Sequence, residues 1–206
     1  MPKASWFLIL MCMALPALAG AASQLEKIEG ETFQLDLRYK TDDNFLKKNV
    51  YAEFGLEQCW VHPDMYAALQ KLAPLLQEKK MKLVFWDCYR PLAVQEAMWK
   101  LVPDARYVAN PKTGSNHNRG IAIDVTLADA EGKPLEMPTA FDDFSAKAAP
   151  ASTCAPADAA KCKNRDLLVE LMKAVGLAPI NTEWWHFQLP HAGKYPIVKT
   201  LDASLP

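Results

Sequence analysis

Two short polar segments, far apart in the chain, most constrain how this sequence can fold. Residues 115–124 read Ser-Asn-His-Asn-Arg-Gly-Ile-Ala-Ile-Asp, and residues 183–186 read Glu-Trp-Trp-His. Together they supply two of the chain's four histidines, one nearby aspartate and one spare glutamate. A catalytic zinc site needs three such protein ligands, an open position for water and a general base. The fold must therefore bring both segments to one place. The candidates are His117, Asp124, Glu183 and His186.

The alternation of residue types over 121–127 predicts a strand that carries one of these candidates. Its odd-numbered positions are all apolar and are expected to pack on helices. Asp124 points to the other face between small residues, which suggests a shallow, open floor for a metal. His117 precedes Gly120, and the conformational freedom of glycine lets this loop turn back toward the same metal. The apolar positions are Ile121, Ile123, Val125 and Leu127.

The spacing within the second segment adds a condition. Glu183 and His186 are three residues apart, so in a flat strand they would face opposite sides. Both approach one metal only if Glu183 lies in the loop before the strand or if a bulge intervenes. Trp184 and Trp185 are then expected to wall the site and pack beneath it. Taken alone, Asp124 could be a solvent-facing strand residue, the first histidine an exposed loop residue and the second a hydrogen-bonded core residue, but their joint occurrence favours a metal site.

A third polar segment, Asp87-Cys88-Tyr89-Arg90-Pro91, directly follows an apolar run. Arg90 stands where a strand is expected to end and a helix to begin. A guanidinium held there can stabilise the oxygen of a polarised carbonyl as it becomes an oxyanion. The alternative is a structural salt bridge between Arg90 and Asp87.

The first twenty residues read as a secretory signal peptide. Lys3 supplies the positive start, an apolar run follows, and Ala17-Leu18-Ala19 is a small-x-small cleavage signature. The run is too short for a permanent membrane anchor, and an uncleaved amphipathic N-terminus is the alternative. We therefore expect a signal peptide over 1–20, a single domain over 21–206, and a periplasmic or secreted protein without a stable membrane anchor.

Cysteine usage agrees with export. Four cysteines remain after the signal peptide, and they allow three pairings. We favour Cys154 with Cys162, which are close in sequence and flank a loop, and Cys59 with Cys88. Zinc binding by cysteines is the alternative, but no C-x-x-C pair is present. A nucleophilic Cys88 is a further alternative that lacks a histidine base.

The charge balance argues against nucleic acid as a partner. The chain has 23 basic and 24 acidic residues, and no basic stripe runs along it. Nothing in the composition indicates a charged polymer as the main ligand.

The remaining pattern predicts short strands mixed with separate helices, and a long excursion over 128–160 held by the Cys154–Cys162 pair. Pro74 is expected to kink or shorten the first helix, and Gly176 to end the third. This mixture predicts an α+β fold with a mostly antiparallel sheet and flanking helices. The expected strands are 35–39, 82–86, 121–127 and 184–189; the expected helices are 63–80, 91–101 and 164–175; and 102–118 is expected to be loop.

These segments together resemble the zinc D-alanyl-D-alanine dipeptidases of the VanX type, whose superfamily includes bacterial D,D-carboxypeptidases and the Hedgehog signalling domain. The resemblance runs from about Tyr39 to His186. It rests on Ser-x-His-x-x-Gly-x-Ala-x-Asp with Glu-x-x-His, and on Asp-x-Tyr-Arg-Pro with the doubled tryptophan. It implies a Hedgehog/D,D-peptidase-like fold, one zinc ion per chain, and hydrolysis of the D-Ala-D-Ala dipeptide to two D-alanines.

The resemblance also implies a role for each candidate residue. Glu183 is the base that takes a proton from the attacking water and passes it to the leaving amine. Arg90 stabilises the tetrahedral intermediate. Asp142 lies near the substrate's free amino group. The implied zinc ligands are His117, Asp124 and His186, and the implied substrate contacts are Tyr39, Ser115 and Asp142.

Two other functions fit the same metal set. One is a peptidoglycan D,D-carboxypeptidase or endopeptidase with an open groove, which chain-length preference would distinguish. The other is a non-catalytic, zinc-stabilised wall-binding module, against which Glu183 and Arg90 argue because a structural metal needs neither. The signal peptide and cysteines differ from the cytoplasmic resistance enzymes of this family. They favour scavenging or turnover of dipeptide released from the cell wall.

Overall fold

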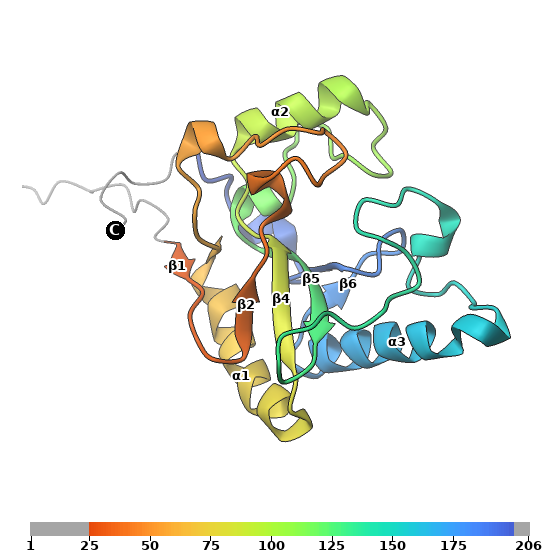
Figure 1. The fold of residues 1–206 in the computed structure, drawn as a ribbon. Helices are drawn as coiled ribbons and strands as arrows, with labels where there is room; N and C mark the ends of the chain where they lie inside the picture. The colour runs from red at the N-terminus through yellow and green to blue at the C-terminus, as the bar shows by residue number, and fades with distance from the viewer. Residues whose placement is uncertain (1–24, 200–206) are drawn as a thin grey trace, which may run out of the picture.

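A five-stranded mixed sheet organises the part of the chain that this computed structural model describes, residues 25–199 (Figure 1). The predicted signal peptide lies outside these residues. One pair of neighbours, β2 with β4, is parallel, and the other three pairs are antiparallel. The prediction of a mostly antiparallel sheet in an α+β fold is therefore confirmed. In sheet order the strands are β2 (Phe33–Leu35), β4 (Lys82–Asp87), β5 (Ala122–Ala128), β7 (His186–Gln188) and β6 (Ala178–Pro179).

Three helices flank this sheet: α1 (Pro63–Lys79), α2 (Leu92–Leu101) and α3 (Ala159–Ala174). α1 contacts β4, α3 contacts β5 and β6, and the two helices contact each other, so they cover one face together. α2 follows the end of β4 and lies beyond it, at the top of Figure 1. Within the described ranges, no helix is long and apolar enough to cross a membrane. A separate small sheet pairs β1 (Glu26–Lys27) with β3 (Trp60–Val61).

The α1 helix follows from its sequence except at one position. His62 caps the start by accepting a hydrogen bond from Asp64 N at 3.1 Å, and Pro63 occupies the first turn, where its missing N–H costs nothing. The expectation that Pro74 shortens the helix is wrong, because α1 continues to Lys79. Packing of its apolar face against the sheet outweighs the loss of one backbone hydrogen bond. That face consists of Met65, Ala68, Leu69, Leu72 and Leu76.

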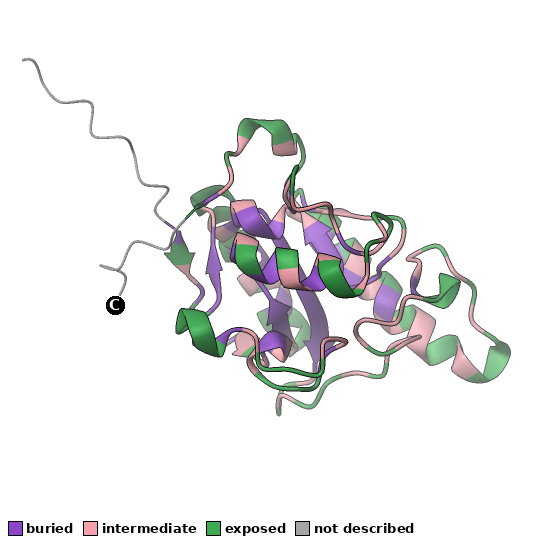
Figure 2. Cartoon of the chain, turned by 90° about the horizontal axis from the view of Figure 1, so that it is seen from above, coloured by how far each residue is buried: buried purple, intermediate pink, exposed green. Residues whose placement is uncertain are grey.

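The central strand β5 is covered on both faces. Every one of its residues is buried, and Figure 2 shows the strands as a buried layer between the helices and the loops. Phe141, from the connection between β5 and α3, packs on Trp86 and Trp185 with ring centroids 5.0 and 5.6 Å apart. The expected shallow, open floor around Asp124 is therefore wrong: the carboxylate lies at the bottom of a cavity.

Three predicted elements have different limits. The strand expected over 35–39 ends at Leu35, and Arg38–Lys40 forms a 3-10 turn because the Asn44 amide binds the carbonyl oxygens of Arg38 and Thr41. The helix expected over 164–175 begins already at Ala159, led in by a short turn. The strand expected over 184–189 is reduced to β7, and its first two residues belong to a loop. The expected end of α3 is confirmed, since Gly176 follows it with φ +86°.

Both favoured disulfides are present. Cys59–Cys88 joins the residue before β3 to the residue after β4, with the Cα atoms 5.4 Å apart. Cys154–Cys162 ties the long excursion to α3, with the Cα atoms 6.0 Å apart. All four cysteines among residues 25–199 are therefore paired, and neither the zinc-binding nor the nucleophilic alternative fits the structure.

Candidate active site

The polar side chains gather where β4 ends and where β5 and β7 begin. Asp124 on β5 stands directly opposite His186 on β7, and it also pairs with Asp87 at the end of β4. The register of β4 shifts between Phe85 and Asp87, and such an irregularity re-aims the side chains that follow it. Three neighbouring strands thus deliver polar groups to one end of an otherwise apolar sheet.

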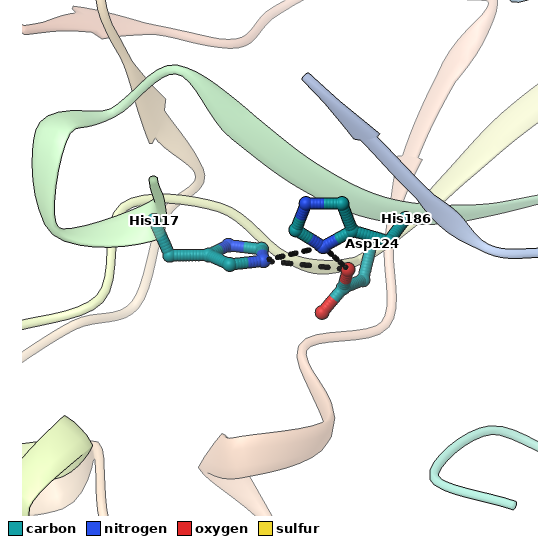
Figure 3. Close-up of side chains that lie close together, drawn as sticks. All are labelled: His117, Asp124 and His186. Carbon is teal, nitrogen blue, oxygen red and sulfur yellow. Dashed lines mark hydrogen bonds and ion pairs between the residues drawn. The ribbon is translucent and has the colours of Figure 1, made fainter. Parts of the chain in front are cut away.

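Two histidines and one aspartate converge at this end (Figure 3). His117 Nε2 lies 3.2 Å from His186 Nδ1, and each nitrogen lies close to Asp124 Oδ1, at 3.4 and 3.0 Å respectively. The three residues are 2%, 7% and 3% exposed, in the order His117, His186, Asp124. His117 is therefore not an exposed loop histidine, and Asp124 is not a solvent-facing strand residue.

The spacing of these three atoms fits a bound zinc ion. Ligand atoms about 2.0–2.1 Å from zinc, at the corners of a tetrahedron, are roughly 3.3–3.4 Å from one another. The observed separations of 3.0–3.4 Å match this spacing. Burial alone would raise the pKa of Asp124, but charge attraction and hydrogen bonds from His117 and His186 hold it well below its usual range. The carboxylate is therefore ionised, as a metal ligand must be.

Outer hydrogen bonds fix which nitrogen of each ring faces the centre. His117 Nδ1 lies 2.8 Å from the Cys88 carbonyl oxygen, which can only accept, so Nδ1 carries the proton and Nε2 offers its lone pair. His186 Nε2 lies 3.2 Å from Gln188 Oε1, which leaves Nδ1 free to bind the metal. Gln188 Oε1 also accepts a hydrogen bond from Asn116 Nδ2 at 2.7 Å, which orients the amide.

Gln188 is a site residue that the sequence reasoning missed. It stands two positions after His186 on β7, and alternate residues of a strand share a face. This spacing is a weak signal, because it becomes specific only once the strand and its cavity are known. Partners of this kind orient the ligands and tune their affinity for metal.

The turn that presents His117 depends on a glycine. His117–Arg119 forms a 3-10 turn, and Gly120 follows it with φ +67°. A Cβ atom at Gly120 would lie 2.9 Å from the backbone nitrogen of His62, which itself donates a hydrogen bond to the Gly120 carbonyl oxygen. The expected role of Gly120, to let the loop turn back, thus has a second physical reason in close backbone packing.

Arg90 enters the site from the turn after β4 and is held firmly. Its Nε and Nη2 donate to Asp87 Oδ2, and Nη1 donates to Gln95 Oε1 at 2.9 Å. Its Nη2 also lies 3.7 Å from Asp124 Oδ2, so the guanidinium stands between two paired carboxylates. The salt-bridge alternative is therefore present in the structure. It leaves two of the five N–H donors without a hydrogen-bond partner among the described residues, and Arg90 lines the cavity.

The charge of Arg90 is secured by its neighbours. Burial alone would lower the pKa of Arg90, but the Asp87 carboxylate raises it well above the ordinary value. Asp87 is itself fully buried, and it accepts hydrogen bonds from the Tyr51 hydroxyl and the Cys88 N–H as well. The site thus contains a fixed, permanent cation.

Glu183 lies in the loop directly before β7, which is the first of the two arrangements that its spacing from His186 allowed. It is 8% exposed and lines the same cavity as the three converging side chains. Burial raises the pKa of Glu183 to about 8, and the charges of Asp124 and Asp142 act in the same direction. A carboxyl with such a pKa can exchange a proton near neutral pH.

The three expected substrate contacts also line this cavity. The Tyr39 hydroxyl donates to Asp142 Oδ1 at 3.2 Å, and the Phe45 N–H donates to Asp142 Oδ2 at 3.3 Å. Burial raises the pKa of Asp142 to about 7, and the charge of Asp124 adds to the shift. Ser115 Oγ accepts a hydrogen bond from the His117 N–H at 3.2 Å.

A single cavity of about 220 Å³ joins these groups, and all eight predicted site residues line it. Trp185 forms part of its wall, as expected. Trp184 does not line it and instead packs in the core against Trp86, with its Nε1 donating to Thr139 Oγ1 at 2.9 Å. The eight are Tyr39, Arg90, Ser115, His117, Asp124, Asp142, Glu183 and His186.

Known proteins resemble this chain over most of its length. A family model described as D-ala-D-ala dipeptidase, of peptidase family M15, matches residues 23–202. A D-alanyl-D-alanine dipeptidase of Escherichia coli strain K12 is 37% identical over 165 residues, which are 80% of this chain and 83% of the relative. A D-alanyl-D-alanine dipeptidase of Enterococcus faecium is 28% identical over 188 residues, 78% of this chain and 89% of that one.

Among solved structures, one match is a mutant of the vancomycin resistance D,D-pentapeptidase VanY from a VanB-type cassette, in complex with Zn(II). It is 16% identical, has a TM-score of 0.40, and covers 68% of this chain and 79% of its own. The family model and the Escherichia coli relative are sufficient to assign the family without the structural match: this chain belongs to the D-Ala-D-Ala dipeptidase family of M15 peptidases.

Proposed function

We propose that this chain is a zinc metallopeptidase that hydrolyses the dipeptide D-Ala-D-Ala to two D-alanines. One observation carries the proposal. In this chain, His117, Asp124 and His186 lie close enough together to bind one ion, and the Glu183 carboxyl and the Arg90 guanidinium line the same small cavity. The relatives named as D-alanyl-D-alanine dipeptidases support the choice of substrate.

His117, Asp124 and His186 would hold one zinc ion per chain. When bound there, zinc lowers the pKa of a water molecule and polarises the peptide carbonyl. The protein's own contribution is to fix the orientation of the two imidazoles with the correct nitrogens inward, through the Cys88 carbonyl oxygen and Gln188.

Glu183 is the general base in this proposal. Its carboxylate takes a proton from the attacking water and returns it to the departing nitrogen, which must be protonated to leave as an amine. Burial with few water contacts keeps its pKa close to the working pH, which favours transfer in both directions. Loss of this group should slow turnover without removing the metal ligands.

Arg90 stabilises the oxygen of the attacked carbonyl as negative charge develops on it. The Asp87 and Gln95 side chains fix the guanidinium in advance, so no reorganisation is needed during the reaction. Its two remaining donors are available to substrate.

The ends of the dipeptide would be recognised by fixed polar groups. Asp142, ordered by Tyr39 and by the Phe45 N–H, pairs with the substrate ammonium. Ser115 lies two residues before the metal ligand His117, and it contacts the substrate from the loop before β5. A cavity of about 220 Å³ suits a ligand as small as a dipeptide.

The cellular setting is part of the proposal. A signal peptide over 1–20 followed by one domain over 21–206 would deliver the enzyme to the periplasm or the medium. Two disulfides support this, since such bonds persist in oxidising compartments. There the enzyme would meet dipeptide released from the cell wall and serve scavenging or wall turnover.

Alanine release from three substrates tests the proposal. The purified, zinc-loaded protein is given D-Ala-D-Ala, L-Ala-L-Ala and a wall pentapeptide that ends in D-Ala-D-Ala. We expect fast release from the D,D-dipeptide alone. Release only from the pentapeptide would reassign the chain as a wall carboxypeptidase, and no release from any of them with zinc bound would leave a binding module.

A further inference from the structure

We propose that the Cys59–Cys88 disulfide positions the zinc centre, in addition to its general effect on stability. The two cysteines are positioning residues: neither lines the cavity, and they act through the backbone that holds His117 and Arg90. This inference rests on the proposed function for the identity of the metal, but its test does not depend on the substrate.

The disulfide lies immediately behind the site. Cys59 is fully buried and Cys88 is 2% exposed. Cys59 precedes β3, whose Trp60 carbonyl oxygen accepts a hydrogen bond from the Tyr89 N–H at 2.9 Å. The disulfide, together with this hydrogen bond, therefore fastens the small β1–β3 sheet to the turn that follows β4.

That turn contacts the metal ligands through its main chain. The Cys88 carbonyl oxygen accepts the proton of His117 Nδ1 at 2.8 Å, which is the contact that sets the tautomer of the ligand. The Arg90 N–H donates to the His117 carbonyl oxygen at 3.1 Å. Asn118, next to His117, donates from Nδ2 to the Arg90 carbonyl oxygen at 2.7 Å. A shift of this turn would move the imidazole and the guanidinium together.

Regular secondary structure does not hold residues 88–90. They follow the register shift at the end of β4 and precede α2, so single hydrogen bonds, from the Tyr89 N–H to Trp60 and from the Arg90 N–H to His117, hold their backbone in place of a strand ladder. A covalent bond at Cys88 limits the displacement that would lengthen the contact from its carbonyl oxygen to His117. Partners that orient metal ligands in this way change metal affinity when they are lost.

The second disulfide provides a matched control. Cys154 and Cys162 are only half-buried and close a shorter loop between the excursion and α3. Cys162 Sγ has a weak contact with the Ser152 carbonyl oxygen at 3.9 Å, and neither cysteine lines the cavity. Removing this bond should loosen the molecule without moving the ligands.

The test compares Cys59→Ala/Cys88→Ala with Cys154→Ala/Cys162→Ala in the full mature chain. Zinc affinity is measured by competition with a chromophoric chelator, well below the melting temperature of each variant. The tautomer of His117 is read from ¹⁵N–¹H nuclear magnetic resonance of its ring. We expect the first variant to bind zinc at least roughly tenfold more weakly and to show mixed tautomers at His117, with the second variant close to wild type.

Two results would overturn the inference: unchanged zinc affinity and tautomer in Cys59→Ala/Cys88→Ala, or equal weakening in both variants, which would indicate a global effect. If the double alanine variant does not fold, Cys59→Val/Cys88→Ala restores part of the lost volume and gives the same reading. Zinc binding that weakens in a protein without dipeptidase turnover would sink the proposed function and leave this inference standing. Normal dipeptidase turnover, with zinc affinity unchanged in Cys59→Ala/Cys88→Ala, would overturn this inference and leave the proposed function standing.

Discussion

At the scale of single residues, the site depends on pairs in which one side chain acts and another holds it. His186 turns Nδ1 toward His117 and Asp124 because Gln188 engages Nε2, and Arg90 is held by Asp87. The candidates for the acting members could be listed from sequence because they are chemically distinctive and lie in short motifs, and the structure gathers them in one cavity. Gln188 could not, because a glutamine two residues after a histidine acquires a role only when the strand and the cavity are in place.

Gln188→Leu should weaken zinc binding without unfolding the protein. The substitution removes the acceptor beside His186 Nε2, so the ring can turn and present the wrong nitrogen. We expect roughly 10- to 100-fold lower affinity in a chelator competition, the usual cost of losing such a partner. Gln34→Leu, on the far strand β2, is the matched control. Equal affinity in the two variants would rule out the proposed role of Gln188.

Asp142 should make substrate binding depend on pH. Its pKa of about 7 means that it loses its charge as pH falls below neutrality, and a neutral carboxyl cannot pair with the substrate ammonium. KM for D-Ala-D-Ala should therefore rise as pH falls, roughly tenfold between pH 8 and pH 6 for a pKa near 7. Zinc in the same cavity lowers the midpoint of this change but not its direction.

Asp142→Asn should raise KM at pH 8 and remove this pH dependence. Asp143→Asn, one position along, is the matched control because it removes the same charge. The Asp143 carboxylate accepts a hydrogen bond from the Ser145 N–H, so this variant should keep the KM profile of wild type. If the profile of Asp142→Asn still follows that of wild type, another group binds the ammonium.

At the scale of elements, the sequence pattern predicted the helices and strands whose apolar faces are buried, and it misplaced the limits of elements that local turns set. The apolar repeat of α1 and the alternation in β5 gave the right elements because both faces are set by the core. The strand expected through Tyr39 ends early, because one asparagine amide folds the chain into a turn. The early start of α3 was missed because its first residues are small and carry no apolar repeat.

Gly120→Ala should disturb the turn that carries His117. Alanine at φ +67° costs about 1–2 kcal/mol in backbone energy, and its Cβ would also press on the His62 backbone nitrogen. Gly176→Ala shares the positive φ but meets nothing within 4 Å. We expect both variants to melt earlier, and only Gly120→Ala to lose zinc affinity. Equal zinc affinity in the two variants would contradict the role given to this turn.

At the scale of the whole molecule, the candidate metal site joins three parts of the chain: the turn before β5, β5 itself and β7. No single segment could reveal the depth of the cavity, which depends on the excursion between β5 and α3 lying over the sheet. This is why the ligand candidates could be listed from sequence but the open floor was wrong. The covering aromatic residues, such as Phe141, have no signal of their own.

Zinc should therefore stabilise the entire fold. At a free concentration 100 times its Kd, a ligand adds about 2.7 kcal/mol to the free energy of unfolding. For a chain of this size that corresponds to a rise of roughly 5–11 °C in Tm. Calorimetry with zinc and after chelation should show this shift in wild type and not in His186→Ala. A zinc-dependent rise that persists in His186→Ala would mean that the ion binds elsewhere.

The most direct test of the central claim measures zinc content and D-Ala-D-Ala hydrolysis on the same preparations of wild type, Glu183→Ala and, as a surface control, Glu170→Ala. We expect one zinc per chain in all three. Turnover should be normal in wild type and Glu170→Ala, and lower by roughly 10²–10⁴-fold in Glu183→Ala, because the base is gone while the ligands remain. Normal hydrolysis by zinc-loaded Glu183→Ala would contradict the account.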